Sequence, residues 1–252
     1  MRQRSNILKL RERLKSFHNK ANVGVLGILN VTPDSFFDGG NSFSVEKAIA
    51  KGLELKNEGA EIIDLGGQSS RPGASSVGAN EEWSRIEPVL EGILERDPTA
   101  LISIDTYRSE VAFKAIHAGA SMINDISAGS LDPELLHVVA EADVPYVLMH
   151  MRGRPENMQN NPEYDDVVRE VSDFFLKKTE ELSGMGIKDI ILDPGFGFGK
   201  QTSDNYALLA NLEAFTEFGM PILVGTSRKS MICNVLNVAP SEALNGTTVT
   251  HT

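Results

Sequence analysis

The sequence is poor in the residues that mark several classes of protein. It has one cysteine, Cys233, which excludes an internal disulfide and leads us to expect a reducing, cytoplasmic environment. No apolar stretch approaches the roughly 20 residues of a membrane span, and the Cys/His spacing of zinc sites is absent. Basic residues number 24 against 35 acidic ones, and this deficit argues against nucleic acid as a partner. We therefore expect neither a membrane nor a nucleic-acid partner.

What is present is the composition of a globular protein. The chain has 252 residues, 41% of them hydrophobic, a length that suits one α/β barrel or two smaller domains. Residues 1–20 hold seven basic residues and one acid, and their apolar residues fit one face of a helix. We predict a basic helical extension over 1–20, with a targeting segment or surface anchor as the alternative. Since no Ser/Gly-rich linker interrupts the rest, 21–252 is predicted to be one domain.

Seven short apolar runs each end in a polar residue or a glycine, with amphipathic helical patterns between them. The runs cover 23–30, 61–64, 101–105, 121–124, 145–150, 187–193 and 221–225. Such near-continuous runs are typical of strands in a parallel sheet with both faces buried. The mean spacing of their ends, 32.5 residues, favours a (β/α)8 TIM barrel over a doubly wound sheet. At that spacing an eighth strand would end beyond Thr252, so we expect the barrel to lack its eighth βα unit.

Polar side chains stand where a barrel carries its active site, at the C-terminal ends of the strands. Asp105, Asn124 and Asp193 end three of the runs, and Lys229 follows a fourth. Any one of them could cap the next helix, but together on one rim they favour a ligand. Carboxylates accept hydrogen bonds and lysine donates them, so a planar heterocycle with an amidine-like edge would match. The spacing does not name the ring.

Other segments near the strand ends also carry polar or flexible residues. The loops 32–40 and 69–73 hold hydroxyls and charges, and the run 225–230 is basic and rich in hydroxyls. In the run 193–200 we expect the glycines to let the backbone approach a flat ligand, with Phe198 lining the pocket. His150 is interpreted as part of the pocket wall rather than as an acid, a base or a metal ligand.

Six segments, in the same order, resemble the signature motifs of the dihydropteroate synthases. They are Gly-Ile-Leu-Asn-Val-Thr-Pro-Asp-Ser-Phe (27–36), Gly-Gln-Ser-Ser-Arg-Pro-Gly (67–73), Ser-Ile-Asp-Thr (103–106), Ile-Asn-Asp (123–125), Leu-Asp-Pro-Gly-Phe-Gly-Phe-Gly-Lys (192–200) and Ser-Arg-Lys-Ser (227–230). The resemblance implies a TIM barrel that condenses 6-hydroxymethyl-7,8-dihydropterin pyrophosphate with p-aminobenzoate, with Mg2+ assisting. It also implies a sulfonamide target and, if the barrel is complete, a homodimer.

The resemblance further implies a role for particular residues. The expected catalytic residues are Asp105, Lys229 and Asn30, and Asn30 is also the expected metal ligand. The expected pterin-binding residues are Asp105, Asn124, Ile126, Met149, Asp193, Phe198, Gly225 and Lys229. The residues expected to bind p-aminobenzoate and pyrophosphate are Thr32, Asp34, Phe36, Ser70, Arg71, Pro72, Ser227 and Arg228.

The sequence departs from the family pattern at three points. Gln68 stands where the family usually has glutamate, Ser70 stands where it has threonine, and the Arg-x-His motif of the eighth strand is absent. One alternative is therefore a pterin-binding but catalytically impaired fragment. The other is a pterin-binding methyltransferase of the methyltetrahydrofolate–corrinoid type.

Overall fold

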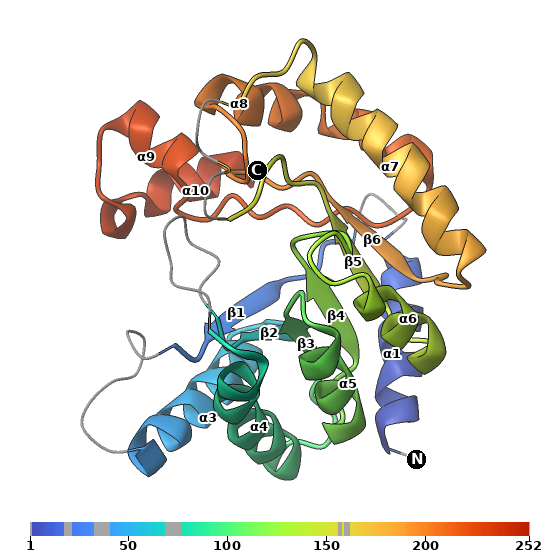
Figure 1. The fold of residues 1–252 in the computed structure, drawn as a ribbon. Coiled ribbons are helices and arrows are strands. Elements are labelled where there is room, and N and C mark those ends of the chain that lie inside the picture. The colour runs from blue at the N-terminus through green and yellow to red at the C-terminus, as the bar shows by residue number, and fades with distance from the viewer. Residues whose placement is uncertain are drawn as a thin grey trace.

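The strands form one parallel sheet in a computed structural model that describes residues 2–17, 22–32, 41–68, 77–155, 158 and 162–251. The strands are β1 (Leu26–Asn30), β2 (Ile62–Gly66), β3 (Ile102–Asp105), β4 (Met122–Asp125), β5 (Tyr146–Met149) and β6 (Ile190–Asp193). Their spatial order is the same as their order along the chain (Figure 1). Parallel neighbours joined by helices are the repeating unit of a βα barrel, so the predicted fold class is confirmed for this part of the chain.

The seventh apolar run pairs with β6 but is not a regular strand. Leu192 and Ile222 form an isolated parallel bridge. The Leu192 amide donates to the Pro221 carbonyl at 2.9 Å, and the Leu223 amide donates to the Leu192 carbonyl at 2.8 Å. Proline has no N–H to add to a ladder, which shortens the pairing at this end.

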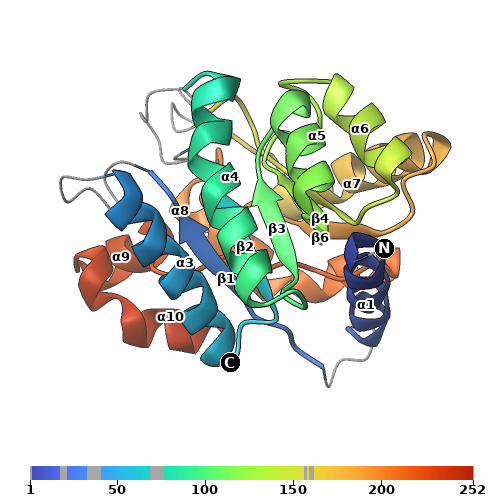
Figure 2. The same cartoon turned by 90° about the horizontal axis from the view of Figure 1, so that it is seen from below.

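Five helices connect the strands. They are α3 (Asn41–Asn57), α4 (Ala79–Arg96), α5 (Ser109–Ala118), α6 (Glu134–Ala142) and α7 (Val167–Gly184). The helices that follow β6 are α8 (Thr202–Ala210), η1 (Leu212–Phe218), α9 (Ser230–Leu236), η2 (Pro240–Glu242) and α10 (Leu244–Thr250). Helices α3 to α6 lie side by side in chain order, and α1 (Arg2–Ser16) stands apart from that row (Figure 2). Each helix in the described part of the chain is too short or too polar to span a lipid bilayer.

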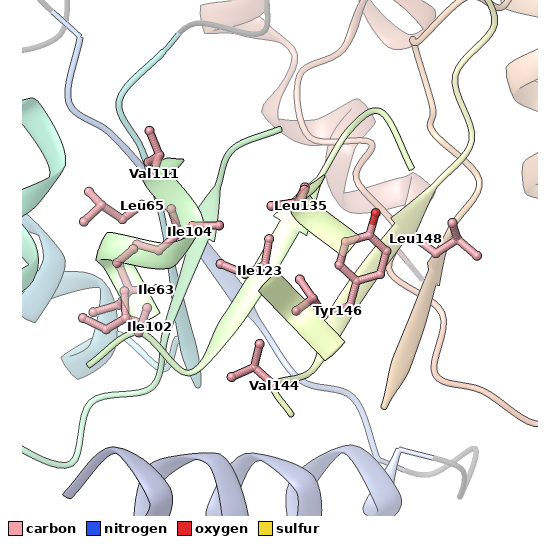
Figure 3. Packing of buried hydrophobic residues seen from close by; sticks show 14 of the residues in the cluster. Ile63, Leu65, Ile102, Ile104, Val111, Ile123, Leu135, Val144, Tyr146 and Leu148 are labelled. Atoms are coloured by element: carbon pink, nitrogen blue, oxygen red, sulfur yellow. The ribbon is translucent and has the colours of Figure 1, made fainter. Parts of the chain in front are cut away.

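Successive residues of each strand contribute to two different apolar clusters. Ile63, Ile104, Ile123 and Tyr146 belong to the larger cluster, which also contains side chains of α5 and α6 (Figure 3). Their chain neighbours Ile62, Met122 and Val147 belong to the smaller cluster, which contains no residue of those helices. Alternation with a period of two is what a strand buried on both faces requires. The sheet therefore has an outer face against the helices and an inner face.

Helix α1 packs against the inner face where the strands begin. Leu10 and Leu14 share the smaller cluster with residues at or just before the starts of the strands, which are Leu26, Ile62, Leu101, Met122 and Ile191. Arg11 adds an ion pair to Asp189 at 2.5 Å, and Arg13 forms one with Glu61. The basic residues thus meet acids at the N-terminal end of the sheet. The division at residues 20 and 21 stays a prediction, because 18–21 lie outside the described part.

Candidate functional site

The inner face carries polar side chains at the end of the sheet opposite α1. Counting in steps of two from the inner-face residues Ile62, Met122 and Ile191 leads to Asp64, Asn124 and Asp193. The same step from Leu101 and Val147 leads through Ser103 to Asp105, and to Met149. Five residues from five neighbouring strands therefore point to one side near the C-terminal ends of the strands, where barrels carry their active sites.

Asn30 and Asp105 meet over a bare stretch of backbone at the end of β2. A Cβ atom built on Gly66 would lie 3.0 Å from Oδ1 of Asn30 and 3.4 Å from Oδ2 of Asp105. Gly66 pairs with both residues in the sheet, and it leaves them room to approach each other. The two predicted catalytic residues thus present oxygen atoms to the same place.

Asp64 joins this group, although the sequence did not identify it as a site residue. Its Oδ2 accepts a hydrogen bond of 2.9 Å from Nδ2 of Asn124, while its Oδ1 has no hydrogen-bond partner among the described residues. The predicted second strand ended at Asp64, but β2 continues to Gly66 and buries the carboxyl. An acid two residues before a Gly-Gly pair, inside a run that continues through Leu65, was the signal that could have indicated it.

Burial dominates the electrostatics of these carboxyl groups. It raises the pKa of Asp64, and the negative charge of Asp193 adds to the rise, while the hydrogen bond from Asn124 opposes it. Burial raises the pKa of Asp105 well above its usual range, with the charge of Asp64 as the next cause. Carboxyl groups gathered in this way favour a ligand that brings hydrogen-bond donors or positive charge.

The opposite side of the group is formed by Asp193, Phe198, Gly225 and Lys229. Lys229 donates a hydrogen bond to the Phe196 carbonyl, and its Nζ lies 4.6 Å from the centre of the Phe198 ring. Gly225 lies beside this amine, because a Cβ atom built on Gly225 would lie 3.8 Å from Nζ of Lys229. Burial raises the pKa of Asp193, and the charge of Lys229 opposes the rise. An acceptor, a donor and an aromatic ring are thus brought together as predicted.

Two glycines in the run between Asp193 and Lys200 are needed for close packing within the protein and not to make room for a ligand. Gly195 has a φ of +71°, and a Cβ there would lie 2.0 Å from the His150 carbonyl oxygen. Gly199 has a φ of +60° and comes equally close to backbone, 2.2 Å from the Arg152 carbonyl oxygen. Both glycines therefore admit the segment that follows β5, which corrects the predicted reason for them.

His150 and Lys200 form a buried pair behind this turn. Nζ of Lys200 lies 3.0 Å from Nδ1 of His150, and burial lowers the pKa of the lysine to about 7. Burial also lowers the pKa of His150 to about 2, with the charges of Lys200 and Arg152 as further causes. His150 is 6% exposed, which agrees with a wall residue.

The remaining predicted site residues divide into three groups. Ile126 and Met149 are buried beside the polar group, at 6% and 2% exposure, and Thr32 follows β1. Ser227 is exposed, and the Arg228 guanidinium donates to the Pro240 and Ser241 carbonyls at 3.0 and 2.8 Å, so the structure does not bring it to the polar group. The residues that lie outside the described part are Asp34, Phe36, Ser70, Arg71 and Pro72.

Gln68, where the sequence departs from the family pattern, is held by two neighbours. Its Nε2 donates to the Tyr107 hydroxyl at 3.2 Å, and its Oε1 accepts from Nη2 of Arg108 at 3.1 Å. Arg108 also forms an ion pair of 3.0 Å with the buried Glu82. The glutamine thus takes part in a polar network just before the predicted loop 69–73. Within the described residues, no group of three or more His, Cys, Asp or Glu side chains could hold a metal ion.

Comparisons with known proteins match this arrangement over almost the whole chain. The family described as pterin binding enzyme matches residues 26–252. The dihydropteroate synthase of Escherichia coli is 49% identical over 224 residues, which are 88% of this chain and 79% of that protein.

Two solved structures point to the same family. A Yersinia pestis dihydropteroate synthase with a sulfonamide drug complex superposes with a TM-score of 0.85 at 42% identity, covering 91% of this chain and 84% of that one. The Xanthomonas albilineans dihydropteroate synthase with 4-aminobenzoic acid gives a TM-score of 0.84 at 44% identity, covering 90% and 82%.

Proposed function

The chain belongs to the pterin-binding enzymes and, among them, to the dihydropteroate synthases, and from this we propose the reaction that it catalyses. It condenses 6-hydroxymethyl-7,8-dihydropterin pyrophosphate with p-aminobenzoate to give 7,8-dihydropteroate and pyrophosphate. The observation that carries the proposal is the gathering of Asp64, Asp105, Asn124, Asp193 and Lys229 at one end of the inner face. This chemistry does not need a catalytic triad of acid, base and nucleophile.

The pterin lies with its amino-pyrimidine edge against the carboxyl groups. A ring N–H beside an exocyclic amino group offers two parallel donors, which a carboxylate such as that of Asp193 accepts as a pair. Asn124 and Asp105 complete the polar contacts, and Lys229 donates to the carbonyl side of the ring. Phe198 and Met149 line the faces of the ring.

The same residues favour the charge that develops during the reaction. The C–O bond to pyrophosphate breaks, the C–N bond to the arylamine forms, and the amine loses a proton. If pyrophosphate leaves first, the pterin methylene becomes cationic. The positive charge favours the ionised form of Asp105 against the burial that raises its pKa, and the carboxylate then stabilises the cation electrostatically in a site of low dielectric. The neutral arylamine attacks directly, without a covalent enzyme intermediate.

Magnesium fits the Asn30 end of the site. Mg2+ keeps several waters and binds through one or two protein oxygens together with substrate phosphates. Oδ1 of Asn30 and Oδ2 of Asp105 flank the same backbone position at Gly66, which suits a hard cation shared with pyrophosphate. Asn30 would hold the ion there, and the ion would neutralise charge on the leaving group.

Two further features belong to the proposal. A sulfonamide drug is present in the Yersinia pestis structure, and we propose that such a drug also occupies the arylamine site of this chain. Ser227 and the predicted loops 32–40 and 69–73 contribute to that site. A complete barrel would work as a homodimer, which sedimentation measurements test.

The test combines turnover with binding. Pyrophosphate release that requires p-aminobenzoate supports the synthase, and pterin binding without release would instead indicate the impaired protein. Methyl transfer to a corrinoid would indicate the methyltransferase.

A matched pair of substitutions tests the site by calorimetry. Asp193→Ala should abolish pterin binding, whereas Asp189→Ala should preserve it because that acid pairs with Arg11 before β6 begins. Unchanged affinity in Asp193→Ala would contradict the assignment.

A further inference from the structure

The side-chain amine of Lys200 is buried among hydrogen-bond acceptors of the protein. It is 3% exposed, and its Nζ lies at hydrogen-bond distance from four acceptors. These are Nδ1 of His150 at 3.0 Å, the His150 carbonyl at 3.1 Å, the Gly195 carbonyl at 3.0 Å and the Phe198 carbonyl at 3.1 Å. A group surrounded in this way cannot also donate to a substrate.

The protons in this cluster come from the lysine. Carbonyl oxygens cannot donate, and an ammonium group carries three protons where a neutral amine carries two. A protonated Lys200 has no lone pair, so Nδ1 of His150 accepts from it and the neutral imidazole carries its proton on Nε2. The low pKa of His150, about 2, agrees with a neutral ring.

The four acceptors belong to two segments that lie far apart in the sequence. His150 follows β5, whereas Gly195 and Phe198 belong to the turn after β6. The same turn holds the Asp193 carboxylate, because the Gly195 amide donates to Oδ1 of Asp193 at 2.7 Å. It also carries the Phe198 ring, which lies under Nζ of Lys229 at 4.6 Å from the ring centre. Fixing the turn therefore fixes the side chains at one end of the site.

We propose that Lys200 is a positioning residue: through its hydrogen bonds to His150, Gly195 and Phe198 it holds the turn 195–199 in the shape that presents Asp193 and Phe198 to the pterin. The inference rests on the proposed function only for the identity of the ligand. It differs from a role in catalysis, since Nζ of Lys200 is directed to four acceptors of the protein itself.

Lys200→Met tests the proposal, because methionine keeps most of the length of the stem and removes every donor. We expect the dissociation constant for 6-hydroxymethylpterin to rise at least tenfold. The KM for p-aminobenzoate, measured at saturating pterin pyrophosphate, should change less than threefold. A loss of stability alone would not produce this split.

The control is Phe175→Leu, a change in the core under α7 that lowers the urea midpoint without touching the turn. It should keep the pterin affinity of the wild type. Wild-type affinity in Lys200→Met would overturn the proposal, as would an equal loss in both variants.

Two measurements do not depend on turnover or on a ligand. Hydrogen exchange of the segment 193–201 should accelerate in Lys200→Met and not in Phe175→Leu. In the wild type, nitrogen NMR should find Nδ1 of His150 without a proton, and a proton on that atom would overturn the proposal even if Lys200→Met fails to fold. If the wild type does not bind the pterin, the proposed function is wrong. Hydrogen exchange and nitrogen NMR would still decide the role of Lys200.

Discussion

Gly195 offers a direct test of how closely the turn after β6 packs against the segment that follows β5. The change is Gly195→Ala, and the matched control is Gly219→Ala. The two glycines have similar left-handed φ angles, +71° and +64°. They differ in space: a Cβ on Gly195 would lie 2.0 Å from the His150 carbonyl oxygen, whereas nothing lies within 4 Å of one on Gly219.

The expected magnitudes follow from that difference. At Gly219 alanine should cost only the left-handed conformation, about 1–2 kcal/mol of the free energy of unfolding. At Gly195 the same cost applies, and the His150 carbonyl or the turn must also move by more than about 1 Å to restore ordinary contact. Overpacking of this kind adds about 1–3 kcal/mol. The movement also disturbs the bond of 3.1 Å from Lys200 to that carbonyl. We expect a total of about 2–5 kcal/mol.

Urea denaturation followed by circular dichroism measures both variants, and calorimetry with 6-hydroxymethylpterin measures the site. Gly195→Ala should lose pterin affinity in the folded protein, and Gly219→Ala should keep it. An unfolding free energy for Gly195→Ala no lower than that of Gly219→Ala would refute the reasoning.

Acid should destabilise the fold through His150. Because burial lowers its pKa from 6.5 to about 2, the unfolded chain binds the proton first, and stability is lost as the pH falls below 6.5. The free energy of unfolding falls by about 1.4 kcal/mol per pH unit. His150→Asn cannot titrate, so its free energy of unfolding, measured by urea titrations between pH 6.5 and 4.5, should fall less steeply with pH, by the contribution of one proton. Equal slopes would contradict this. At the other end of the sheet, Leu10→Ala should cost about 2–5 kcal/mol, since Leu10 is fully buried. Leu8→Ala, at a position 52% exposed, should change the urea midpoint little, and similar losses in the two variants would show that α1 does not pack as described.

Much of the site was predictable because barrels place polar residues by local rules. The strand rhythm, the polar residue at each strand end and the period of two are all visible in the chain. They led to Asp105, Asn124 and Asp193, which lie together on the inner face. Asp64 also ends a predicted run but was not identified as a site residue, and only the structure shows that β2 continues to Gly66 and buries its carboxyl group. Arg228 follows a strand end as expected, but its side chain turns to the carbonyls of residues 240 and 241.

The sequence by itself determined the βα repeat, the end of the sheet that carries the chemistry and, through six motifs, the family. These depend on short-range patterns, which a linear chain displays directly. The structure alone decided how α1 packs against the starts of the strands and how Lys200 comes to be buried among acceptors. His150 and Lys200 are 50 residues apart in the chain, so only the pairing of β5 with β6 brings them together. Burial is likewise a property of the assembled fold, and it is burial that shifts the pKa values and lowers that of Lys200 to about 7.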